Sequence, residues 1–71
     1  MAGDVIFAKR LREARKAKKL SVGQVAERIY ASLGATYKYE EANTEPSIHT
    51  LRRLCDVLGV SADYLIGRSD G

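Results

Sequence analysis

Residues 21–41 constrain the fold most strongly, because this stretch contains two helix starts close together. Ser21 is a natural N-cap, and Gln24 three residues later completes a capping box. A second helix can start at Ser32, another good cap residue. Two helices of about two to three turns, joined by about two or three residues, suit a helix-turn-helix. An ordinary corner of a small helical bundle fits this local pattern equally well.

Apolar residues recur at helical spacing along the chain and predict an all-α fold of five short helices. We expect the first helix to be capped by Asp4 and to run to about Lys18 or Lys19, with an apolar stripe formed by Phe7, Leu11, Ala14 and Lys18. Within the central stretch, the residues expected to face inward are Val25, Ala26, Ile29, Thr36, Tyr39 and Glu40.

Two further helices are expected after a turn at residues 42–46. Ser47 should cap the fourth and Gly59 should end it, with an apolar face made by Ile48, Leu51, Leu54, Cys55 and Leu58. Ser61 should cap the fifth, which ends at Gly67 and turns Leu65 and Ile66 toward the core. We predict one compact domain over residues 1–71, with frayed ends at about 1–3 and 68–71.

Arg15 lies beside the apolar stripe of the first helix, one turn after Leu11. A guanidinium at the edge of a core needs a carboxylate partner, because an unpaired charge there would cost several kcal/mol. Glu40 is the best candidate, since it lies on the inward side of the second helix of the central stretch. The sequence therefore predicts an Arg15–Glu40 ion pair that joins these two helices.

Charge is distributed unevenly along the chain. Residues 1–19 carry seven Lys/Arg against two Asp/Glu, a net of +5, whereas residues 39–71 carry three against six, a net of −3. A polyanion bound on one side would explain this asymmetry, and a solvated basic face explains it equally well. The basic stripe of the first helix is expected to be mainly such a solvated face and consists of Lys9, Arg12, Lys16 and Lys19.

The sequence offers little for catalysis or for binding metals. His49 is the only histidine and Cys55 the only cysteine, so neither a zinc site nor a Cys–His dyad can be built within one chain. We expect His49 at the surface and Cys55 as a small buried residue, with no enzyme activity, metal or cofactor. No apolar run is long enough to span a bilayer and no signal peptide is evident. The single cysteine rules out an internal disulfide, so a reducing, cytoplasmic setting is expected.

Four segments in order, KRLREARKAKKLS, VAERI, YEEANTEPS and LRRLCDVLGVSADYLIG, resemble the phage repressor and Cro type of helix-turn-helix domain, also called Xre-like or lambda-repressor-like. The resemblance covers roughly residues 6–67 without a gap. It implies five helices, of which the third, at about residues 33–41, reads double-stranded DNA in the major groove. An ion pair at the positions of Arg15 and Glu40 is typical of this family.

The resemblance also implies the residues that contact DNA. The base-facing positions are Leu33, Gly34, Tyr37 and Lys38. Phosphates would be met by the openings of the two motif helices and by the loop that follows them, at Ser21, Val22, Ser32, Asn43 and Thr44.

Several positions depart from the family pattern. Tyr30 stands where the turn usually has glycine, Ala42 replaces a loop glycine, and Thr36 replaces an aliphatic core residue. Leu33 and Gly34 occupy positions where relatives carry amide or basic side chains that read bases, so a strong sequence code is not implied. One reconciliation is that the second helix runs on through Ala31 and Gly34 forms the turn.

The resemblance implies a sequence-specific DNA-binding regulator of bacterial or phage type, most simply a repressor that binds a two-fold operator as a homodimer. Pairing would use exposed apolar residues near the fifth helix, at Val60, Tyr64 and Ile66, or would occur only on DNA. The alternative is a protein-interaction module of the same fold, antitoxin-like or anti-repressor, with weak or no DNA binding. The apolar Leu33 favours this alternative, whereas the basic first helix favours DNA.

Overall fold

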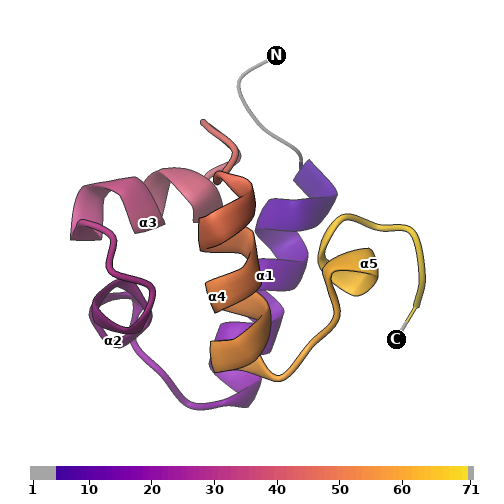
Figure 1. Cartoon of the computed structure of the whole chain (residues 1–71), viewed down its shortest axis with the longest axis horizontal. Helices are drawn as coiled ribbons and strands as arrows, with labels where there is room; N and C mark the ends of the chain where they lie inside the picture. The colour runs from indigo at the N-terminus through magenta and orange to yellow at the C-terminus, as the bar shows by residue number, and fades with distance from the viewer. Residues whose placement is uncertain (1–4, 71) are drawn as a thin grey trace.

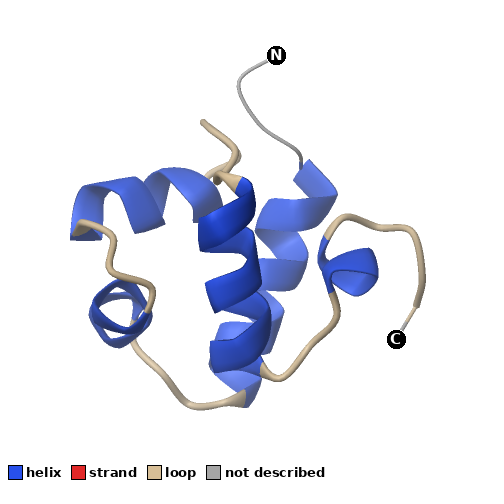
Figure 2. Ribbon diagram, in the orientation of Figure 1, coloured by secondary structure: helices blue, strands red, loops and turns tan. Residues whose placement is uncertain are grey.

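The structure is a computed structural model that describes residues 5–70, and five helices account for most of this range. They are α1 (Val5–Ala17), α2 (Val22–Arg28), α3 (Leu33–Glu40), α4 (Ile48–Leu58) and α5 (Ala62–Leu65). No strand occurs among the described residues, as Figure 2 shows. The all-α prediction is confirmed, and the predicted cap at Asp4 and frayed residues 1–3 lie outside the described range.

Four of the helices begin at a serine, as the sequence predicts. The side-chain oxygens of Ser21, Ser32, Ser47 and Ser61 each accept a hydrogen bond from the backbone N–H three residues later, at 3.0–3.2 Å. At Ser21 the capping box is complete, because the backbone N–H of Ser21 also donates to Gln24 Oε1 at 2.8 Å. The serines therefore satisfy N–H groups that would otherwise lack a partner within the helix.

All five helices end in the same way, with one residue in the left-handed conformation. The residue after it donates its N–H to the carbonyl five positions earlier, which is the bond of a Schellman motif. These bonds run from Leu20 to Arg15, Ala31 to Ala26, Asn43 to Lys38, Val60 to Cys55 and Arg68 to Asp63. Glycine supplies the left-handed residue only after α4 and α5, and the first three helices use Lys19, Tyr30 and Ala42, with φ of 58–60°.

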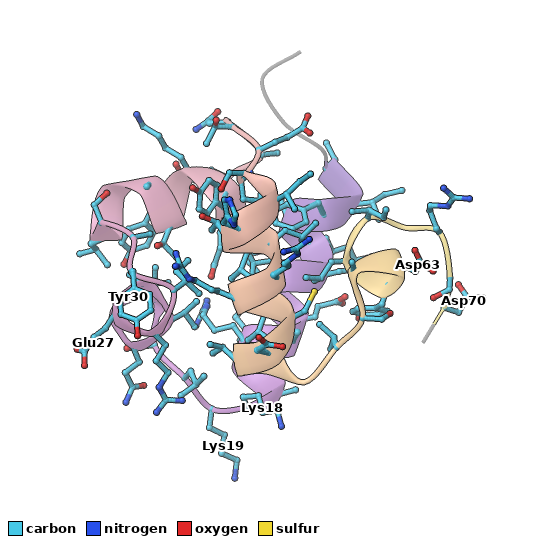
Figure 3. All side chains as sticks on the ribbon, viewed as in Figure 1. Lys18, Lys19, Glu27, Tyr30, Asp63 and Asp70 are labelled. Carbon is cyan, nitrogen blue, oxygen red and sulfur yellow. The ribbon has the colours of Figure 1, made fainter. Side chains whose placement is uncertain are left out.

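The connection between α2 and α3 turns at Tyr30, and the alternative in which Gly34 forms the turn is wrong. Helix α2 ends at Arg28, and Gly34 is the second residue of α3. The Tyr30 side chain is 82% exposed, and the guanidinium of Arg53 on α4 lies 4.9 Å from its ring centroid. This cation–π contact is one compensation for an aromatic residue at a position that favours glycine. Figure 3 shows Tyr30 beside α2.

The core lies between the helices, and in the view of Figure 1 α2 and α3 lie on one side of α4 and α5 on the other. Its largest fully buried apolar side chains come from every helix except α3 and are Leu11, Val25, Ile29, Leu54, Leu58 and Leu65. The described residues of the domain are therefore joined by one continuous apolar cluster.

Four predicted core residues are less buried than expected. Lys18 follows the last residue of α1 and is exposed, and Ala8, which was not predicted in the core, is buried. Ile48 is 69% exposed because helical geometry turns it about 120° away from Leu54, at the edge of the apolar face. Ile66 caps the end of α5 and is 40% exposed, and Cys55 is half-buried.

Residues 68–70, which the sequence predicts to be frayed, make contacts with α1. Nη1 of Arg10 donates to the carbonyls of Tyr64 and Ser69, both at 2.6 Å, and its guanidinium lies 4.6 Å from the Tyr64 ring centroid. Asp70 is 3.7 Å from Nη2 of the same arginine. Arg10 thus attaches α5 and the segment after it to α1.

Helix α3 is attached to α1 by the predicted ion pair between Arg15 and Glu40. Arg15 Nε and Nη2 donate to the two carboxylate oxygens of Glu40, at 2.6 and 3.1 Å, and Nη1 donates to the carbonyl of Leu20 at 2.9 Å. The side chains of the pair are only 13% and 6% exposed. Such a bidentate pair fixes direction as well as distance, so it sets the orientation of α3.

Two further polar contacts secure α3. Arg12, which the sequence places on the solvated stripe, is half-buried and donates from Nη1 to the backbone carbonyl of Glu40. This carbonyl belongs to the last turn of α3, where no partner exists within the helix. Thr36 is fully buried, and its hydroxyl donates to the carbonyl of Ser32 at 3.0 Å. The inward face of α3 is therefore polar but satisfied.

The left-handed residue at position 42 gives a direct test of the helix ends. Ala42→Gly should raise the free energy of unfolding by about 0.5–1 kcal/mol, because it removes Cβ strain that exceeds the extra entropy of glycine in the unfolded chain. Ala35→Gly, within α3, should lower it by about 1 kcal/mol. Urea unfolding followed by circular dichroism measures both, and a loss of stability in Ala42→Gly would contradict this expectation.

The ion pair can be tested by charge reversal. Arg15→Glu or Glu40→Arg alone should cost about 3–5 kcal/mol of unfolding free energy, because each leaves like charges in a poorly hydrated site. The double reversal should recover part of this loss, but not all, since the Leu20 carbonyl loses its donor. Equal losses in the single and double variants, measured by the same urea titration, would show that the two side chains do not act as a pair.

Candidate nucleic-acid interface

The outward face of α3 carries all four predicted base-facing residues. Leu33 and Tyr37 are 50% and 47% exposed, and Gly34 and Lys38 are also exposed. Positions i, i+1, i+4 and i+5 share one broad side of a helix, and the buried Thr36 and Glu40 lie along the side adjacent to it. The ion pair that holds the inner face therefore leaves this outer face uncovered by the described chain.

Gly34 has no packing role within the domain. A Cβ at this position would meet no atom within 4 Å, and its backbone is not left-handed. Glycine within a helix costs about 1 kcal/mol relative to alanine, so its presence here brings no gain in stability. Because glycine has no side chain, another molecule could approach the backbone of α3 closely between Leu33 and Tyr37.

The openings of α2 and α3 lie next to this face. Leu33 Cδ1 is 4.0 Å from the point where a Cβ on Gly23 would lie, so the first turn of α2 borders Leu33. The Val22 side chain is buried, which leaves only its backbone N–H for an outside partner. The hydroxyls of Ser21 and Ser32 already accept hydrogen bonds from their own helices. Any phosphate here would meet backbone N–H groups and hydroxyl protons of the first turns.

The loop after α3 extends the same surface. An open hollow of about 760 Å³ is lined by residues of α3 and of this loop, including Ser32, Gly34, Lys38, Asn43 and Thr44. Asn43 is exposed and donates to Glu41 Oε1 at 3.3 Å, whereas Thr44 is half-buried. The structure thus brings five of the predicted contact residues to one hollow, with Ser21 and Val22 at its far side beyond Leu33.

The basic residues of α1 and of the turn after it do not form one uniform face. Lys9, Lys16 and Lys19 are exposed, and Figure 3 shows Lys19 pointing away from the helices. Arg12 instead donates a hydrogen bond to α3. Lys18 extends toward Gly59 at the end of α4, where its positive charge is attracted to the negative end of the helix dipole. Sequence spacing gave no signal for the roles of Lys18 or Arg53, because their partners come from other helices.

The described residues offer no metal centre and no activated nucleophile. No group of three or more His, Cys, Asp or Glu side chains among them could hold a metal ion. Burial raises the pKa of the Cys55 thiol, and the neighbouring Asp56 carboxylate raises it further, so the thiol stays protonated near neutrality. His49 is exposed. None of the helices in the described range is long and apolar enough to cross a membrane.

Solved structures of two DNA-binding regulators share this architecture. The P22 c2 repressor, solved in complex with a synthetic operator, superposes with a TM-score of 0.85 and 28% identity over 90% of this chain and 97% of that one. The N-terminal DNA-binding domain of SinR from Bacillus subtilis gives a TM-score of 0.80 and 27% identity, over 87% and 91% of the two chains.

Proteins with similar sequences are also transcriptional regulators of the helix-turn-helix type. YobD of Bacillus subtilis (strain 168), an HTH-type transcriptional regulator, is 35% identical over 65 residues, which are 92% of this chain and 58% of YobD. This chain spans little more than half the length of YobD and of two further curated relatives. The sequence model of the protein family described as a helix-turn-helix domain matches residues 6–65. The chain therefore belongs to the helix-turn-helix domain family and has the fold of the phage repressors.

Proposed function

We propose that this chain is the DNA-binding domain of a transcriptional regulator, most simply a repressor, and that α3 enters the major groove of double-stranded DNA. The observation that carries the proposal is the outer face of α3. Its four residues are exposed together, next to the openings of two helices, while the inner face is fixed by buried polar contacts. Relatives described as HTH-type transcriptional regulators, one neighbour solved with a synthetic operator and another solved with DNA support it.

Reading of bases would rest on three side chains. Lys38 can donate to guanine O6 and N7, a contact worth on the order of 1–3 kcal/mol of discrimination. Leu33 and Tyr37, one turn apart on α3, offer apolar contact, for example to thymine methyl groups. Gly34 reads nothing itself, but it lets the helix approach the base edges. The expected code is therefore short and depends on few hydrogen bonds.

Phosphate contacts would set the position of the domain on DNA. The first-turn N–H groups of α2 and α3, with the hydroxyls of Ser21 and Ser32, would contact one set of phosphates. Asn43 and Thr44, in the loop after α3, would contact another set. These contacts would hold α3 in the groove without carrying sequence information.

The size of the domain suits a half-site. It measures 27 × 27 × 20 Å, less than the roughly 34 Å of one turn of DNA that separates two half-sites. We propose that two copies bind a two-fold operator. The predicted pairing residues Val60, Tyr64 and Ile66 do not share one hollow, because the first two line a cleft with Glu13 and the third lines another with Pro46.

A protein-interaction module remains the second candidate, on the specific observation that Leu33 and Tyr37 expose apolar surface on α3. A partner helix or groove could cover these two side chains. This candidate predicts no binding to random or genomic DNA fragments at low salt, and little effect of charge at position 38 on partner binding.

Gel shifts with random and genomic DNA fragments test the proposal. If about four phosphates are contacted, affinity should fall about 100-fold between roughly 50 and 200 mM salt, because each contact releases counterions. Lys38→Glu should weaken binding tenfold or more, on the order of the 1–3 kcal/mol of a base contact.

Arg68→Glu is the matched control for this experiment. It makes the same change in charge, and Arg68 follows α5, on the other side of α4 from α3 (Figure 1). It should therefore bind nearly as wild type does. Salt-independent affinity, or equal losses in the two variants, would count against the proposal, and no binding to any fragment would favour the protein-interaction module.

A further inference from the structure

Glycine at position 34 leaves the backbone of α3 open at the middle of its outward face. Around the helix, Gly34 lies about 60° from Tyr37 on one side and about 40° from Lys38 on the other. Helical side chains lean toward the N-terminus, so these two side chains, one turn later, border the open backbone. A Cβ on Gly34 would meet no atom within 4 Å, so no other part of the described chain fills this opening.

The Tyr37 side of the opening is apolar. Leu33 lies one turn before Tyr37, and both side chains are about half exposed. Gly23 of α2 borders Leu33 from another direction, with 4.0 Å between Leu33 Cδ1 and the position of a Cβ on this glycine. Since Gly23 and Gly34 carry no side chains, a flat group such as the edge of a base can reach Leu33 without a clash.

Base edges in the major groove of DNA present one apolar substituent. It is the 5-methyl group of thymine, whereas the other groups there are hydrogen-bond donors or acceptors. A donor or acceptor placed against Leu33 would lose its water without gaining a partner, which is unfavourable. A methyl group gains apolar contact in the same place. The apolar side of the opening therefore favours a methyl group over a hydrogen-bonding group.

The same methyl group occurs in 5-methylcytosine, at the same ring position as in thymine. The two bases differ in the neighbouring group, which is an acceptor in thymine and an amino donor in cytosine. Neither Leu33 nor Gly34 has a side-chain group that can read this difference. We propose that the opening at Gly34 is a binding site for the 5-methyl group of pyrimidines, so that this chain binds 5-methylcytosine in DNA as it binds thymine. The inference rests on the proposed function, since it requires α3 to lie in the major groove.

This role explains a glycine at a helical position that gains nothing from it. Alanine would favour the helix, and its Cβ would fit within the domain. On DNA, however, that Cβ would hold the base edge away from the backbone of α3 and from Leu33. Gly34 is therefore a specificity-determining position, and the methylation state of cytosine determines the affinity of a site that contains it.

Gel shifts at one salt concentration test the proposal, with a fragment selected from random or genomic DNA for binding to this chain. Replacement of its thymines by uracil removes only the 5-methyl groups and keeps every hydrogen-bonding atom. Burial of one such group is worth about 0.8 kcal/mol, so affinity should fall about fourfold for each contacted thymine.

A second pair of fragments tests 5-methylcytosine directly. Single uracil replacements identify a contacted thymine, which is then changed to cytosine with guanine opposite. The fragment with cytosine methylated at C5 should bind about fourfold more tightly than the same fragment without this methyl group.

Three variants connect the methyl effect with α3. Leu33→Ala should reduce the difference between thymine and uracil DNA to about twofold or less, because apolar contact is lost. Lys38→Ala is the matched control on the other side of the opening, and it should bind both DNAs more weakly while keeping the full difference. Gly34→Ala should unfold at a higher urea concentration, because alanine favours the helix, yet lose most of the difference. A purely structural role of Gly34 cannot produce this combination.

Equal affinity of the wild-type chain for thymine and uracil DNA would overturn the inference and leave the proposed DNA binding in place. An undiminished methyl effect in Leu33→Ala and Gly34→Ala would also overturn it, since the methyl groups would then act through the shape of the DNA. Failure of the wild-type chain to bind any fragment would instead contradict the proposed function, and the inference with it.

Discussion

The ion pair between Arg15 and Glu40 is the interaction on which the candidate interface depends. Helix α3 buries only Thr36 and Glu40, so it contributes no large, fully buried apolar side chain to the core. The bidentate contact with Arg15 and the bond from Arg12 to the carbonyl of Glu40 attach it to α1, and Tyr39 packs against the core. Apolar packing tolerates small rotations, whereas paired hydrogen bonds do not, and a reading helix requires this directional control.

Polar attachment of the inner face frees the outer face of α3 from any structural duty. Leu33, Gly34, Tyr37 and Lys38 can change without loss of core contacts, so specificity can vary on a constant scaffold. At three helix ends, a residue other than glycine is left-handed, which costs backbone strain. Lys19, Tyr30 and Ala42 are left-handed without being glycine, and the Schellman bonds and the Arg53 contact offset the resulting strain.

Local signals in the sequence predicted much of this fold. Each serine cap bonds a residue only three positions later, and Gly59 ends α4 through its own left-handed conformation. Both features can therefore be predicted from local sequence without knowledge of the tertiary structure. The Arg15–Glu40 pair was predictable because a cation at the edge of a core has few acidic candidates. Contacts that join distant helices were not predictable, including Arg12 with α3, Arg10 with residues 64–70 and Arg53 with Tyr30.

The candidate site was predicted only in part. Helical spacing placed the four base-facing residues on one side of α3, where the structure has them, but spacing could not show that the Val22 side chain is buried. The apolar periodicity of α4 suggested a face that is wholly inside the core. The structure divides this face between the core and an exposed strip, because Ile48 lies at its edge. The contacts of individual residues with DNA remain predictions.

Mapping of the backbone N–H signals by NMR during titration with DNA would locate the DNA-binding surface on the folded domain. We expect the largest chemical-shift changes on residues 21–23, 32–38 and 43–44, at the openings of α2 and α3 and in the loop after α3. The signals of Arg10 and of residues 62–66 should move little. Changes centred on α5, or spread evenly over the basic residues of α1, would contradict the claim that the exposed face of α3 is the surface that binds DNA.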